Sequence, residues 1–119
     1  MQYLLPHELY HKTQWLIRDY PRLKTEYEAA IGKAAKLDGM PGGSEISDPT
    51  PRDVAVRLRY ADDVKAVERG FEHIPEEYRE GVFGAIAYRD RYPQTAALST
   101  WRRWRQRAVY WTAWERGWI

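Results

Sequence analysis

The chain has 119 residues, of which 44% are hydrophobic and 30% charged, which suits one compact domain or a domain with an appendage. It contains no cysteine, which excludes disulfides, zinc–thiolate sites and thiol catalysis, and no apolar run is long enough to predict a membrane span or a signal peptide. The formal net charge of +2 is uneven: residues 1–69 hold eleven Lys/Arg and eleven Asp/Glu, whereas residues 70–119 hold eight arginines and six acids.

The first part of the chain predicts helix. A helix is expected from about His7 to Arg18, after a short lead that ends before Pro6. Pro21 interrupts the pattern, because a proline inside a helix removes a hydrogen bond and clashes with the preceding turn. The sequence leaves open whether one kinked helix or two helices meeting at Tyr20 result. An amphipathic face then follows, made of Leu23, Tyr27, Ala30, Ile31 and Ala34.

The clearest break in the chain is the stretch from Gly39 to Pro51, where three prolines and three glycines exclude regular structure. Thr50 is expected to cap the next helix, which runs from Pro51 to about His73. The predicted buried face of that helix carries Val54, Leu58, Ala61, Val64, Val67 and Phe71, and Gly70 is expected to loosen its end. The stretches 21–38 and 51–73 therefore predict an antiparallel helical hairpin.

A third helical stretch is expected from Pro75 to about Arg89, with acids at its positively polarised N-terminus. The run Arg91-Tyr92-Pro93 ends it, and a linker from Gln94 to Leu98 leads to the last helix. No run alternates between apolar and polar residues, so no strand is expected and the predicted fold class is all-α.

The final segment predicts a helix with two different faces. Ser99 is a good N-cap residue, and Gly117 is a natural stop because glycine tolerates positive φ. Six tryptophans and nine tyrosines in the chain suit half-buried surfaces. One apolar stripe of this helix contains Trp101, Trp104, Ala108, Trp111 and Trp118. The opposite side carries Arg102, Arg103, Gln106 and Tyr110, and arginine and glutamine are residues that contact base edges and phosphates.

Two enzyme-like patterns are weaker than their structural alternatives. His7, Glu8 and His11 match H-E-x-x-H, in which two histidines hold zinc. A working site needs a third ligand and a cavity, so surface polar residues in a first helical turn are the preferred interpretation. The run Gly42-Gly43-Ser44 lacks the arrangement of a phosphate-binding loop. We therefore expect neither an enzyme nor a cofactor or metal.

Two blocks of sequence and a motif between them occur in the order seen in a known family. The first block is Leu37-Asp38-Gly39-Met40-Pro41, Gly43-Ser44 and Ser47-Asp48-Pro49-Thr50. The last is Ser99-Thr100, Arg103-Trp104-Arg105, Tyr110, Ala113, Glu115 and Gly117-Trp118, and Ile74-Pro75-Glu76-Glu77-Tyr78-Arg79 lies between them. Over roughly residues 15–119 the chain thus resembles the RinA-type phage transcriptional activators of Gram-positive bacteria.

The resemblance implies a cytoplasmic activator of phage late or packaging genes, with a helix-turn-helix similar to the promoter-reading region of sigma factors. It divides the chain into an N-terminal helical hairpin, 1–74, and a C-terminal DNA-binding-like helix pair, 75–119. The implied partner is double-stranded DNA, with RNA polymerase and a second copy of the chain as further candidates, and no membrane. The predicted DNA-binding residues are Ser99, Thr100, Arg102, Arg103, Gln106, Arg107 and Tyr110.

The chain departs from the family where the helix that supports the recognition helix is expected. Only six residues, Pro93 to Leu98, separate Tyr92 from Ser99, which truncates the helix-turn-helix. The alternative function is therefore a helical interaction protein or packaging-associated phage protein, an oligomer or a partner of RNA polymerase or terminase, without sequence-specific DNA binding.

Overall fold

The computed structural model describes residues 2–38 and 51–119. Side chains are described for these residues except 32–38 and 51–56. This part of the chain holds four helices and no strand, which confirms the all-α fold class. The helices are α1 (His7–Asp38), α2 (Pro51–Glu72), α3 (Glu76–Ala87) and α4 (Leu98–Glu115). The Gly/Pro loop predicted for 39–51, apart from Pro51, and the Thr50 cap lie outside the described residues, as do the side chains of Ala34 and Val54.

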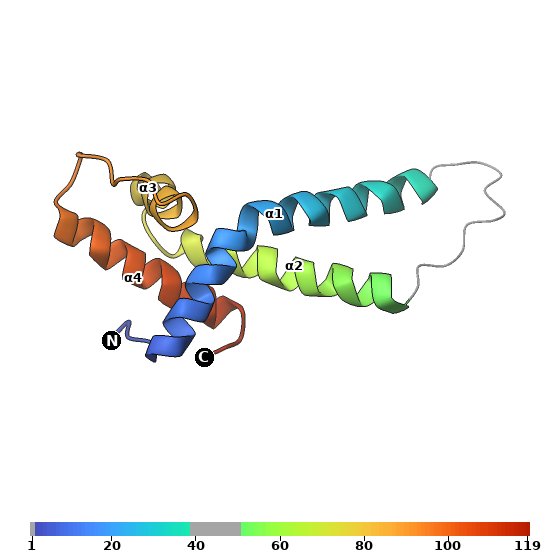
Figure 1. Ribbon diagram of the computed structural model, residues 1–119, viewed down its shortest axis with the longest axis horizontal. Helices are drawn as coiled ribbons and strands as arrows, with labels where there is room; N and C mark the ends of the chain where they lie inside the picture. The colour runs from blue at the N-terminus through green and yellow to red at the C-terminus, as the bar shows by residue number, and fades with distance from the viewer. Residues whose placement is uncertain (1, 39–50) are drawn as a thin grey trace.

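The sequence left open whether one kinked helix or two helices result at Pro21. The structure has one helix, α1, of 32 residues with the proline inside it. In Figure 1 its axis changes direction part-way along, and the second part then runs beside α2 in the opposite sense. An internal proline is a usual cause of such a bend, since it cannot donate to the carbonyl one turn earlier. The bend brings the first part of α1 across α4 and leaves the second part paired with α2 (Figure 1).

One hydrophobic cluster joins all four helices. Its fully buried side chains include Ile17 of α1, Val67 of α2, Ile86 of α3 and Val109 of α4. Among the described residues, α2 makes its most extensive contacts with α4 and then with α1. No helix within residues 2–38 and 51–119 is long and apolar enough to span a bilayer.

Two residues predicted to face the core are exposed instead. Leu58 is 63% exposed and Ile31 43% exposed. Leu58 is nine positions from the buried Val67, which places the two about half a turn apart on a helix of 3.6 residues per turn. Tyr60 packs against the cluster where Leu58 was expected to do so. At this position the inner face of α2 therefore includes Tyr60 and not Leu58.

Candidate nucleic-acid interface

The two ends of α4 are formed differently from each other. Ala97 precedes the helix without any side-chain cap, so the prediction that Ser99 caps it is wrong. The backbone N–H groups of Thr100 and Trp101 already reach the carbonyl of Ala97, which places Ser99 inside the first turn. The predicted stop at Gly117 is confirmed, because this residue has φ of +83°.

The C-terminal end of α4 forms a Schellman motif. The N–H of Trp118 donates to the carbonyl of Ala113 at 2.9 Å, and the N–H of Gly117 to that of Trp114 at 3.0 Å. These bonds satisfy carbonyl groups that a helix end otherwise leaves without partners. The motif turns the Trp118 ring back toward α1, where Lys12 Nζ lies 4.1 Å from the ring centroid.

Fewer indoles are buried on the inward face of α4 than the sequence predicted. Trp101 and Ala108 are buried as expected, but Trp104, Trp111 and Trp118 are only half-buried. The seam is completed by small side chains, those of Val109, Thr112 and Ala113. Small residues are required here because α2 approaches so closely that a Cβ on Gly70 would lie 2.7 Å from the backbone nitrogen of Thr112.

Two of the half-buried indoles stack on rings from other segments. His73 stacks on Trp111 with centroids 4.1 Å apart, and its Nε2 lies 3.0 Å from Glu115 Oε1. Tyr78 of α3 stacks on Trp104 at 5.5 Å. These contacts hold α4 against the ends of α2 and α3, so the outward face belongs to a fixed helix.

That outward face carries most of the predicted DNA-binding residues. Ser99, Arg103, Gln106 and Tyr110 follow one another at spacings of four, three and four, so they are neighbours along one side of α4. Ser99, Arg102 and Arg103 are exposed, and Thr100, Gln106, Arg107 and Tyr110 are half-buried. Within the described part of the chain, no carboxylate forms an ion pair with Arg102, Arg103 or Arg107.

Two further arginines, Arg105 within α4 and Arg116 at its C-cap, bond to other segments of the chain. Arg105 Nη1 donates to the hydroxyl of Tyr92 at 3.3 Å, which ties α4 to the connector before it. Arg116 Nε donates to Asp63 Oδ1 of α2 at 2.6 Å, and both side chains are largely buried. The basic run therefore divides into arginines that hold the fold and arginines that face outward.

The connector between α3 and α4 contains no helix. Helix α3 ends at Ala87, earlier than predicted, and Arg89 has a φ of 56° that turns the chain out of the helix. Tyr92 then stacks on Trp101 at 5.6 Å, and a hollow of about 430 Å³ lies beside this pair. Trp101 is 2% exposed, and its Nε1–H has no partner among the described residues.

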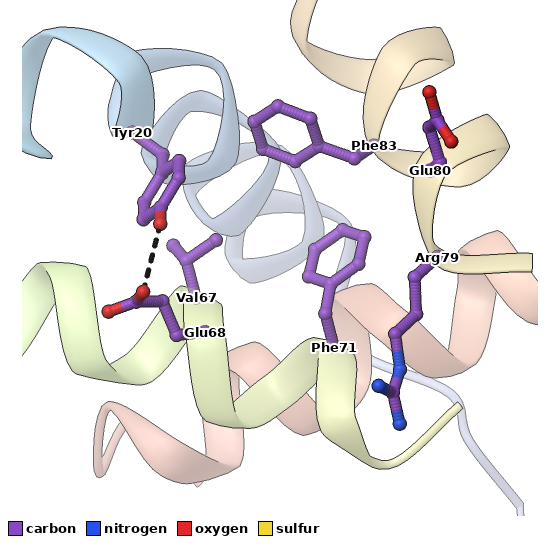
Figure 2. Close-up of a pocket in the computed structure, with 7 residues that line it drawn as sticks. All are labelled: Tyr20, Val67, Glu68, Phe71, Arg79, Glu80 and Phe83. Carbon is purple, nitrogen blue, oxygen red and sulfur yellow. Dashed lines mark hydrogen bonds between the residues drawn. The ribbon is translucent and has the colours of Figure 1, made fainter. Parts of the chain in front are cut away.

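The second hollow, of about 260 Å³, lies between α1, α2 and α3, away from the outward face of α4. Figure 2 shows the rings of Phe71 and Phe83 beside each other at this hollow and Tyr20 pointing toward Glu68. The Tyr20 hydroxyl donates to the Glu68 carboxylate at 3.1 Å, and burial raises the pKa of Tyr20 above its ordinary value. The rings of Phe71 and Phe83 and the side chain of Val67 supply an apolar lining, which suits contact with an apolar side chain.

The H-E-x-x-H pattern forms the first turns of α1. The rings of His7 and His11 lie 4.3 Å apart, and both side chains are exposed. No group of three or more His, Cys, Asp or Glu side chains suited to a metal surrounds them within the described residues. The pattern thus stands on the exposed surface of α1.

One residue beside the outward face of α4 was not predicted from the sequence. Tyr3, in the segment before α1, packs edge-on against Tyr110 at 5.2 Å, and Arg107 lies 4.7 Å from its ring centroid. A single tyrosine ahead of the first helix gives no periodic signal, so only the folded chain reveals the contact.

Comparison of the chain with protein-family models, curated proteins and solved structures finds no match.

Proposed function

We propose that the protein is a phage or prophage transcriptional regulator that binds double-stranded DNA through the outward face of α4. The observation that carries the proposal is a pair of exposed arginines, Arg102 and Arg103, without a carboxylate partner among the described residues. They stand on a helix held on its inner side by α2. Unpaired guanidinium groups on a fixed helix are suited to phosphate oxygens and to guanine edges in the major groove.

The resemblance to RinA-type activators supports the choice of DNA over other polyanions. Under this proposal α1 and α2 form the N-terminal hairpin, and α3 and α4 form a truncated helix-turn-helix. The connector of residues 88–97 takes the place of the short helix that crosses the DNA backbone in a complete motif. Stacking of Tyr92 on Trp101 then fixes the start of α4, which the missing helix would otherwise support.

The test is a titration of labelled duplex DNA, followed by fluorescence anisotropy at several salt concentrations. The variant Arg102→Ala/Arg103→Ala should bind more weakly and lower the slope of log K against log salt by about two if both residues contact phosphates. The control Arg59→Ala/Lys65→Ala removes the same charge from exposed positions on α2. An equal loss in both variants would show attraction by net charge alone and contradict a defined interface.

A second candidate function is protein interaction, favoured by apolar side chains left at the surface. Leu58 is 63% and Trp15 61% exposed, and the apolar hollow beside Phe83 is open. Tryptophan at an interface frequently dominates binding energy. Under this alternative the chain associates with itself or with RNA polymerase or terminase, and Leu58→Ser/Trp15→Ser should lower the sedimentation coefficient of a concentrated sample. Monomeric behaviour of the unaltered chain at every concentration would contradict self-association.

A further inference from the structure

The segment before α1 lies over one flank of α4 although it has no regular secondary structure. Its Tyr3 ring meets Tyr110 edge-on at 5.2 Å and Trp111 at 6.0 Å. The carbonyl of Pro6 accepts the N–H of Tyr10 at 2.9 Å, which joins the segment to the first turn of α1. The N-terminal residues are therefore placed beside side chains more than a hundred positions away.

Arg107 lies against two rings supplied by different parts of the chain. Its Cζ is 4.7 Å from the centroid of Tyr3 and 4.9 Å from that of Trp104. Trp104 is held in turn by stacking on Tyr78. A guanidinium group is attracted to the faces of aromatic rings, and the attraction is stronger where water is excluded. The half-buried guanidinium group of Arg107 thus lies over two aromatic rings.

This arrangement leaves the hydrogen-bonding edges of Arg107 without a partner. A guanidinium group carries five N–H donors in its plane, so contacts on its faces do not consume them. No hydrogen bond or ion pair joins Arg107 to another side chain within the described residues. The free N–H donors of a half-buried guanidinium group suit an anion that presents two oxygens side by side, and a phosphate group does so.

The location of Arg107 matches the proposed DNA-binding face. It follows Arg103 by four positions, one turn along the same side of α4. Stacking of unpaired bases is not favoured here, because Trp104 is half-buried and already contacts Tyr78 and Arg107. The Arg107 guanidinium group is therefore suited to contact with the phosphates of a nucleic-acid backbone.

We infer that Arg107 is a phosphate contact whose geometry is set by Tyr3, so that the N-terminal segment is part of the nucleic-acid interface. Tyr3 is a positioning residue in this scheme: its ring holds the guanidinium in place, and the guanidinium touches the phosphate. The inference rests on the proposed function and deepens it. It adds a segment that lies outside the C-terminal helix pair to the surface that meets DNA.

The test compares the salt dependence of binding to one labelled mixed-sequence duplex for several variants. Arg107→Ala should weaken binding and lower the salt slope by about one. Tyr3→Leu keeps apolar contact with Tyr110 and Trp111 but removes the π face, and it should lower the slope to a similar degree although it removes no charge. Tyr3→Phe keeps the face and should bind like the unaltered chain. The double variant Tyr3→Leu/Arg107→Ala should bind no more weakly than Arg107→Ala.

The control is Tyr88→Ala, which removes an exposed ring of the connector that packs on Phe83. Thermal unfolding of each variant separates loss of the fold from loss of the contact. An unchanged slope for Tyr3→Leu, with a lowered slope for Arg102→Ala/Arg103→Ala, would overturn this inference and leave the proposed function standing. Absence of salt-dependent duplex binding by the unaltered chain would instead overturn the proposed function.

Discussion

Gly70 of α2 lies directly against Thr112 of α4, closer than any side chain at position 70 would permit. A Cβ there would meet Thr112 Oγ1 and would lie 2.7 Å from both the Cα and the backbone nitrogen of that residue. Thr112 is fully buried, and its hydroxyl donates to the carbonyl of Ala108 at 2.8 Å. The glycine that was expected to loosen the end of α2 therefore permits a close crossing of α2 and α4.

We expect Gly70→Ala to destabilise the protein by about 1–3 kcal/mol, because the added methyl group meets backbone atoms that cannot rotate away. Urea unfolding followed by circular dichroism measures the change. The control is Gly84→Ala, whose Cβ would approach only the Asp90 carboxylate at 3.0 Å. That side chain is exposed and able to swing aside, so the control should keep or slightly raise stability. Similar losses at the two positions would contradict the close crossing.

We expect Arg116→Ala to lower the free energy of unfolding by about 1–3 kcal/mol, because it leaves the Asp63 carboxylate without its partner. The two side chains are only 25% and 14% exposed, and Arg116 Nε lies 2.6 Å from Asp63 Oδ1. Arg22 pairs with Asp19 and Glu26 at the open surface, where solvent screens the charges, so Arg22→Ala should change stability by less than Arg116→Ala does. DNA affinity that falls as far in Arg116→Ala as in Arg102→Ala/Arg103→Ala would refute the division of the arginines into two roles.

We expect Gly117→Ala to cost about 1 kcal/mol, because φ of +83° is unfavourable for a residue with a Cβ. No atom lies within 4 Å of the added Cβ, so the cost comes from the backbone alone. Gly117→Asn should recover part of the loss, since asparagine tolerates this conformation better. Thermal unfolding of the two variants checks the order, and equal stability of all three chains would mean that the helix ends without the Schellman turn.

Local signals in the sequence were sufficient for the helices themselves. Periodicity and end residues predicted an all-α chain and the approximate spans of α2 and α3, and Gly117 was confirmed as the stop of α4. The outward stripe of Ser99, Arg103 and Gln106 could also be predicted, because residues three and four apart on a helix share a side wherever the helix lies. These features depend on neighbours within one or two turns.

Contacts between distant segments decided the rest. Whether Pro21 bends one helix or separates two depends on packing on both sides of it, and Leu58 faces outward because α1 covers the other side of α2. The same holds for the roles of the arginines: Asp63 on α2 engages Arg116, and Tyr3 reaches Arg107 from the other end of the chain. Helical periodicity sets the direction of a side chain about its own axis, and only the docking of the helices determines which partner it meets.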